Sequence, residues 1–136
     1  MKKISWLKVA SIVLLLNFAG HMLGLLSSAK SPDVREAVAS MQSHSFHAGS
    51  VVRTFWDFYF GFSLIVGMSL LLMAVLCWQL DSLLKASPER ARPMVAVLCM
   101  TATGFAAVAW IYIFAVPAMF ITVIAACLWT AYFTAN

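Results

Sequence analysis

The sequence predicts an all-α membrane protein: a bundle of four antiparallel transmembrane helices with a short extracytoplasmic amphipathic helix. Three observations favour this fold class. Hydrophobic residues make up 63% of the 136 residues, charged residues only 10%, and apolar runs of bilayer-spanning length recur along the chain. A soluble domain carries about 25% charged residues, so a chain this apolar needs lipid over its surface. The length predicts one domain over residues 1–136.

The first apolar run, over about residues 4–26, predicts the first span. At about 1.5 Å per residue, a run of this length crosses a hydrocarbon core of about 30 Å. A signal peptide is the alternative, with Ser27-Ser28-Ala29 as a small-residue cleavage site. The length of the run and the polar Asn17 and His21 within it favour an uncleaved helix.

Residues 27–54 form the one long polar stretch. Ser31-Pro32-Asp33 predicts a helix start, in which Asp33 caps the helix and Glu36 completes a pair resembling a capping box. Apolar residues on one side of this helix predict that it lies on the bilayer or over the bundle; they are Val34, Ala37, Val38, Met41 and Phe46. Gly49 breaks the pattern.

The second span is predicted over about residues 55–80, and its aromatic start indicates the level of the lipid headgroups. A charged connector with two prolines follows, from Asp81 to Pro93. The remaining apolar run is too long for one crossing, and Pro117 divides it. The third span is therefore expected at about 94–115 and the fourth at about 117–133.

Basic residues predict the orientation, because they gather on the cytoplasmic side of membrane proteins. Six lie on the side of the termini, namely Lys2, Lys3, Lys8, Lys85, Arg90 and Arg92, and three on the other side, namely Lys30, Arg35 and Arg53. Both termini are therefore expected in the cytoplasm, with the 27–54 segment outside.

Several partners and cofactors are not expected. The net charge of +4 is spread over short segments, so no nucleic-acid partner is predicted. Buried free thiols are expected at Cys77, Cys99 and Cys127, which lie within apolar runs. No second histidine lies at the depth of His21 to hold a haem, and no cofactor is predicted. His44 and His47 are candidate metal ligands only if a third ligand joins them.

Arg53 and Asp57 mark the candidate site, because residues four apart share one face of a helix and can pair. Ionisable groups within a span usually have a function. Counting residues from the span ends brings His21, Asp57, Tyr112 and Thr122 to a similar depth. Asn17 shares a face with His21, and the Gly20-x-x-x-Gly24 spacing allows a partner helix to approach closely.

The candidate ligand-binding residues are therefore Asn17, His21, Arg53, Trp56, Asp57, Tyr59 and Tyr112. Simpler interpretations remain open for them. His21 is also consistent with a structural hydrogen bond, the Arg53–Asp57 pair with an ion pair that caps the second span, and the aromatic residues with an interfacial belt.

The chain resembles a family of small bacterial four-helix integral membrane proteins that carries no established activity. The matching motifs are Gly20-His21-x-x-Gly24, Met41-Gln42, and Arg53-x-x-Trp56-Asp57-Phe58-Tyr59-x-Gly61-Phe62, followed by Trp78-Gln79-Leu80, Ala91-Arg92-Pro93 and Pro117. The resemblance implies four spans and a bacterial inner membrane. It supplies no catalytic residues.

The function expected from these features is non-enzymatic: an outer-leaflet polar and aromatic pocket that binds a lipid, a small amphipathic ligand or a partner helix. The expected partners are membrane lipid and either a second copy or another membrane helix. One alternative is a small membrane enzyme that uses His21 and Asp57 as an acid–base pair on an apolar substrate. The other is an ion-coupled transport subunit.

Overall fold

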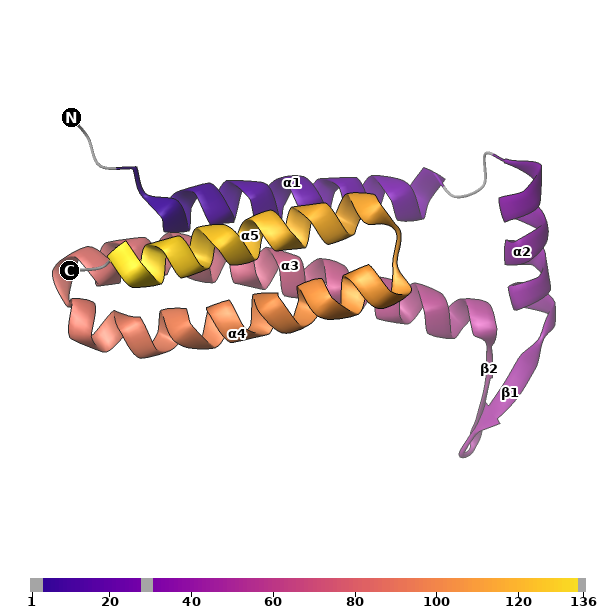
Figure 1. The fold of residues 1–136 in the computed structure, drawn as a ribbon. Helices are drawn as coiled ribbons and strands as arrows, with labels where there is room; N and C mark the ends of the chain where they lie inside the picture. The colour runs from indigo at the N-terminus through magenta and orange to yellow at the C-terminus, as the bar shows by residue number, and fades with distance from the viewer. Residues whose placement is uncertain (1–3, 28–30, 135–136) are drawn as a thin grey trace. The chain divides into compact units, whose positions relative to one another are not determined.

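The computed structural model describes residues 4–27 and 31–134 of the chain. Lys2, Lys3, Lys30 and the proposed cleavage site at Ser28 and Ala29 lie outside the described residues. The described chain is almost entirely helical, with five helices and one small hairpin (Figure 1). The helices are α1 (Trp6–Ser27), α2 (Pro32–Ser43), α3 (Phe55–Ala86), α4 (Pro88–Tyr112) and α5 (Ala115–Thr134), and the strands are β1 (Ser45–Ala48) and β2 (Val51–Thr54).

Four of these helices, α1, α3, α4 and α5, are long and apolar enough to cross a membrane. This finding confirms the predicted all-α class and indicates a multi-pass membrane protein. By its contacts the chain divides into two compact units. The first, here called the bundle unit, comprises the chain up to Phe18 together with the chain from Leu70 onward. The second, the hairpin unit, runs from Ala19 to Ser69.

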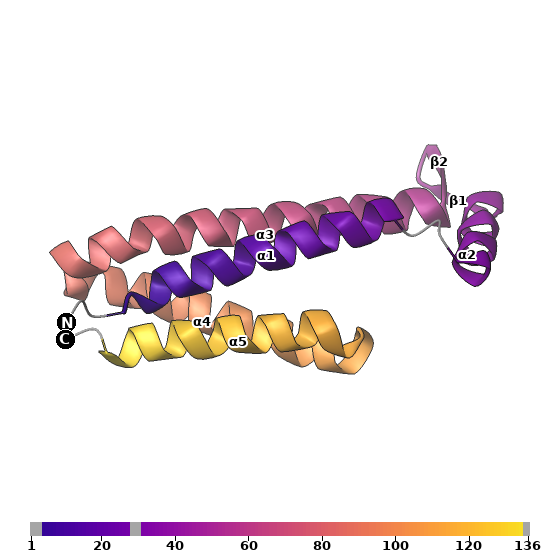
Figure 2. The ribbon, with the colours of Figure 1, turned by 90° about the horizontal axis from the view of Figure 1, so that it is seen from above.

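One apolar core fills the bundle unit, between the first part of α1, the later part of α3, α4 and α5. The largest side chains that are fully buried there include Leu7, Leu14, Val95, Ile124 and Leu128. Helices α4 and α5 lie side by side and antiparallel (Figures 1 and 2). All three cysteines are buried free thiols, as predicted.

Two predicted helix ends in the bundle unit are wrong. The segment from Asp81 to Pro93 is helical except at Ser87, because α3 continues to Ala86 and α4 begins at Pro88. Proline suits this first helical position, where its missing N–H has no partner in any case. For the same reason Pro117 does not separate the last two helices: it lies in the first turn of α5, and the break falls at Ile113 and Phe114.

The hairpin unit contains α2 and the β1–β2 hairpin, which leads directly into α3 (Figure 1). Helix α2 lies where a helix was expected, but Asp33 is not its cap. Ser31 caps it by accepting a hydrogen bond from the backbone N–H of Val34 at 3.3 Å, and Asp33 lies in the first turn. Phe46, expected on the helix, lies in β1 and pairs with Arg53 of β2.

Candidate functional site

The junction between β2 and α3 is built by a reciprocal pair of hydrogen bonds. The backbone N–H of Thr54 donates to Asp57 Oδ2 at 2.9 Å, and the backbone N–H of Asp57 donates to Thr54 Oγ1 at 3.1 Å. This is a capping box, with aspartate in the place of the usual glutamate. It fixes the direction in which α3 leaves the hairpin, and it places a negative charge at the positive end of the helix dipole.

The predicted ion pair between Arg53 and Asp57 is not formed. Arg53 lies in β2 rather than on the helix, so the four-residue spacing does not place the two side chains on one helical face. Its Nη1 donates instead to the carbonyl oxygen of Val52 at 3.1 Å. The capping role expected of the pair belongs to Thr54 and Asp57.

Arg53 and Asp57 nevertheless line one groove of about 230 Å³, here called the Arg53 groove. Its other lining residues are Phe58, Gly61, Phe62 and Ile65. The two phenylalanines and Ile65 are each more than half exposed, so the groove continues along α3 as an open apolar surface. A Cβ added at Gly61 would meet no neighbouring part of the described chain within 4 Å, so the space beside this glycine is open.

Trp56 and Tyr59 line a different groove of about 280 Å³, here called the Trp56 groove. Their rings lie 5.7 Å apart between centroids. Helix α2 supplies the other wall, with Asp33 and four of the apolar residues that the sequence places on one side of the helix, namely Val34, Ala37, Val38 and Met41. That side of α2 therefore faces the aromatic start of α3.

The two grooves lie on different faces of α3, because residues three and four apart share a face of a helix. Asp57, Gly61 and Ile65 follow one face, whereas Trp56, Tyr59 and Ser63 follow another. The single pocket expected from the sequence, with Arg53 and Asp57 as its rim and Trp56 and Tyr59 as its walls, is thus divided in two.

His21, in α1, contacts the backbone of α3 at Ser63. Its Nε2 is 2.8 Å from the carbonyl oxygen of Ser63, and Nε2 donates in the tautomer that carries the proton there. Ser63 lies six residues beyond Asp57, or about 9 Å further along the helix. His21 and Asp57 therefore share no hydrogen bond in the described chain, and the contact fits the structural interpretation of His21.

The remaining predicted site residues belong to the bundle unit. Asn17 is buried, with 7% of its surface exposed, whereas Tyr112 ends α4 and is 80% exposed. Thr122 accepts a hydrogen bond from Trp110 Nε1 at 3.0 Å and donates to the carbonyl oxygen of Ala118. Thr122 thus joins α5 to α4.

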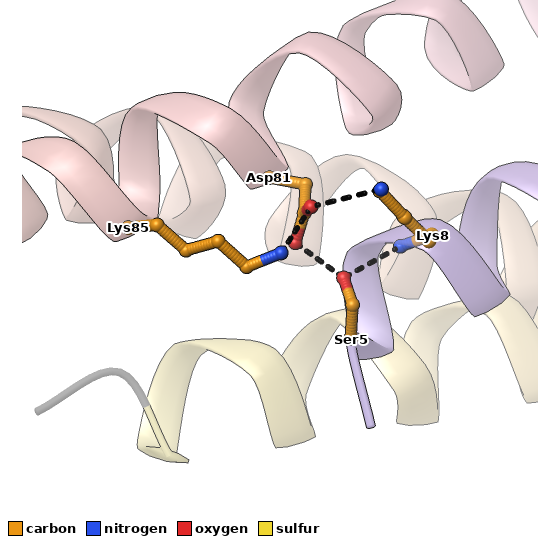
Figure 3. A network of polar contacts seen from close by, with 4 residues as sticks. All are labelled: Ser5, Lys8, Asp81 and Lys85. Carbon is orange, nitrogen blue, oxygen red and sulfur yellow. Dashed lines mark hydrogen bonds and ion pairs between the residues drawn. The ribbon is translucent and has the colours of Figure 1, made fainter. Parts of the chain in front are cut away.

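Sequence reasoning missed a charged network in the bundle unit, because Asp81 was expected in a connector. Its side chain is only 6% exposed and is surrounded by donors (Figure 3). Ser5 Oγ donates to Oδ1, Lys85 Nζ lies 2.6 Å from Oδ2, and Lys8 Nζ lies 3.7 Å from the same oxygen. The spacing of Asp81 and Lys85, four apart in helical register, was the available signal.

The histidines of the polar stretch have local roles in the structure. His44 Nδ1 lies 2.8 Å from the carbonyl oxygen of Ser40, and His47 pairs with Val52 in the hairpin. Among residues 4–27 and 31–134, no three histidine, cysteine, aspartate or glutamate side chains gather into a possible metal site. A third ligand for His44 and His47 is therefore missing from this part of the chain.

The features that bear on function are thus four helices of membrane-spanning character, two grooves in the hairpin unit and a buried carboxylate in the bundle unit. No family model, curated protein or solved structure matches the chain.

Proposed function

We propose that this chain is a non-enzymatic integral membrane protein that binds an amphipathic lipid in the Arg53 groove. The observation that carries the proposal is the composition of this groove. It combines a cationic and an anionic side chain at one end with an open apolar surface along the helix. An amphipathic lipid has the same division between a charged headgroup and an apolar chain.

The chemistry of the lining favours a zwitterionic phospholipid. The guanidinium of Arg53 suits a phosphate oxygen through charge-assisted hydrogen bonds, and the carboxylate of Asp57 suits an ammonium group. Phe58, Phe62 and Ile65 offer apolar contacts to the first part of an acyl chain, and Gly61 leaves room for that chain. Phosphatidylethanolamine carries both charges and is the probe of choice.

The proposed setting is a bacterial inner membrane with both termini in the cytoplasm. It rests on the distribution of basic residues and on the resemblance of the sequence to small bacterial membrane proteins. In this orientation α2 is a short amphipathic helix on the outer side, and the Arg53 groove opens to the outer leaflet. Self-association through the Gly20-x-x-x-Gly24 face is compatible with this arrangement.

The test is to fill the groove without disturbing the fold. Gly61→Leu adds a side chain whose Cβ meets no neighbouring part of the described chain within 4 Å. Gly104→Leu is the matched control, because Gly104 also lies within a long helix with no described atom within 4 Å of an added Cβ. The measurement is the occupancy of phosphatidylethanolamine on the delipidated full chain, followed by native mass spectrometry during lipid titration.

We expect at least tenfold weaker lipid binding for Gly61→Leu and wild-type binding for Gly104→Leu. Arg53→Gln removes the phosphate partner without filling the groove and should weaken binding by about the same factor, since a charge-assisted hydrogen bond contributes about 1.5–3 kcal/mol. Undiminished binding by both Gly61→Leu and Arg53→Gln would refute the proposal.

The enzymatic alternative has less support. His21 contacts a backbone carbonyl oxygen and Asp57 caps α3, so neither has the partner that acid–base chemistry needs. The transport alternative needs a polar path through the helices, whereas the buried polar side chains of the bundle unit, Ser11, Asn17 and Asp81, are few beside its apolar core.

A further inference from the structure

The network around Asp81 holds more positive than negative charge. One carboxylate faces two ammonium groups, those of Lys8 and Lys85, while the third donor, Ser5, is neutral (Figure 3). One positive charge is therefore left over within the network. This charge lies at the surface, because the side chains of Lys8 and Lys85 are 43% and 64% exposed.

The two ammonium groups lie close together at the surface, whereas the carboxylate between them is buried. Both Nζ atoms approach the same oxygen, Asp81 Oδ2, at 3.7 and 2.6 Å, so they lie within bridging distance of one tetrahedral oxyanion. An ammonium group has three donors, and the ion pair with Asp81 leaves further N–H groups of each lysine available. The ion pairs with the two ammonium groups offset the negative charge of Asp81, so an anion that approaches the lysines meets one net positive charge.

The location points to a lipid as the source of that anion. Lys8 lies in the first turn of α1 and Lys85 in the last turn of α3, two helices of membrane-spanning character. Lys8 Nζ also lies 4.9 Å from the ring centroid of Trp78, which is half exposed. Tryptophan is enriched at the level of the lipid headgroups, so the two ammonium groups are set where lipid phosphates are found.

We propose that Lys8 and Lys85 together bind the phosphate of an anionic phospholipid at this end of the bundle unit. Asp81 and Ser5 are positioning residues in this site: Asp81 draws the two ammonium groups from α1 and α3 to one point, and Ser5 holds the carboxylate. Anionic lipids are attracted to basic groups close to the membrane surface. The site uses none of the residues of the Arg53 groove, and it does not depend on the function proposed for that groove.

The test uses the full chain in detergent, delipidated and titrated with phosphatidylglycerol, with phosphatidylcholine as the neutral lipid. Occupancy is followed by native mass spectrometry, and inorganic phosphate is titrated separately. The variants are Lys85→Gln and Lys8→Gln, with Arg92→Gln as the charge-matched control in the same unit. Arg92 lies over the ring of Tyr132, 5.2 Å from its centroid, and makes no contact with the network in the described chain.

We expect the wild-type chain to prefer phosphatidylglycerol to phosphatidylcholine, and Lys85→Gln and Lys8→Gln to bind phosphatidylglycerol about tenfold more weakly. Arg92→Gln should bind like the wild type. Lys85→Arg should restore most of the binding, because it keeps a cation at the exposed position. A thermal unfolding curve for each variant separates weak binding from loss of the fold.

Three outcomes would overturn the proposal. Equal losses in Lys85→Gln and Arg92→Gln would indicate a diffuse positive surface rather than a site. Wild-type affinity in a folded Lys85→Gln chain would remove Lys85 from any such site. Saturable binding of inorganic phosphate without a preference for phosphatidylglycerol would assign the two lysines to a free phosphate ion instead of a lipid.

Discussion

Thr54 and Asp57 show at the residue scale how one pair of side chains sets the geometry of a whole groove. Thr54 is the last residue of β2, and Asp57 lies in the first turn of α3. Their two hydrogen bonds satisfy backbone N–H groups that would otherwise lack partners at the start of the helix. The same contacts hold Arg53, one residue earlier, beside the face of α3 that lines the Arg53 groove.

Removing the hydroxyl of Thr54 tests this role. Thr54→Val keeps the shape of the side chain but deprives the N–H of Asp57 of its acceptor, so we expect a loss of about 1 kcal/mol in the free energy of unfolding. Thr101→Val is the control, because Thr101 Oγ1 only donates to the carbonyl oxygen of Val97 within its own helix. Denaturant unfolding in detergent, followed by circular dichroism, measures both variants, and equal stabilities would contradict the capping role.

The Arg53–Asp57 spacing also explains why the site was predicted only in part. Both residues line one groove, but the spacing rule assumes a helix, and Arg53 lies in a strand. Because α3 begins at Phe55, Arg53 does not belong to any of its faces. Asp81 was missed because its burial depends on Ser5 and Lys8, which are distant in sequence.

At the scale of elements, length and apolar composition were sufficient to predict the four long helices, but not their ends. The ends depend on caps, as at Ser31, and on prolines that lie in the first turn of a helix rather than break it, as at Pro88 and Pro117. The hairpin was missed because its strands have only four residues each. Its signal was Gly49-Ser50 between two short runs, a two-residue loop with glycine at the first position.

Gly49 supports a prediction at this scale. Its φ of +64° lies in the left-handed region, where a Cβ costs about 1–2 kcal/mol. Gly49→Ala should therefore loosen the hairpin, whereas Gly104→Ala, within α4, should stabilise its helix by about 0.5–1 kcal/mol. Limited trypsin digestion reports the hairpin, because Arg53 is exposed in β2.

Cleavage after Arg53 should be about fivefold or more faster in Gly49→Ala than in the wild type, because opening of the hairpin becomes easier by at least 1 kcal/mol. It should be unchanged in Gly104→Ala, whose stabilised helix is remote in sequence from the cleavage site. Ring contacts of Phe46 with Phe55 and Phe58, at 5.1 and 5.9 Å, hold the hairpin to the start of α3. Equal cleavage rates in all three proteins would mean that the conformation of Gly49 contributes little to the stability of the hairpin.

At the scale of the whole molecule, the proposed orientation in the membrane rests on the distribution of basic residues. If α3 crosses the bilayer, its two ends lie on opposite sides, and the end with Lys85, Arg90 and Arg92 is the more basic. The excess of basic residues favours the cytoplasm for that end. In the proposed orientation the hairpin then faces outward.

Two exposed positions test this orientation, Ser50 in the hairpin turn and Ala86 at the end of α3. In intact cells a membrane-impermeant maleimide should label Ser50→Cys at once, and should label Ala86→Cys only after the membrane is permeabilised. The wild-type chain supplies the background, since Cys77, Cys99 and Cys127 are buried thiols that the reagent reaches poorly. Labelling of Ala86→Cys alone in intact cells would contradict the proposed orientation. Labelling of both would mean that α3 does not cross, and neither groove nor network would then be set at the depth that lipid binding requires.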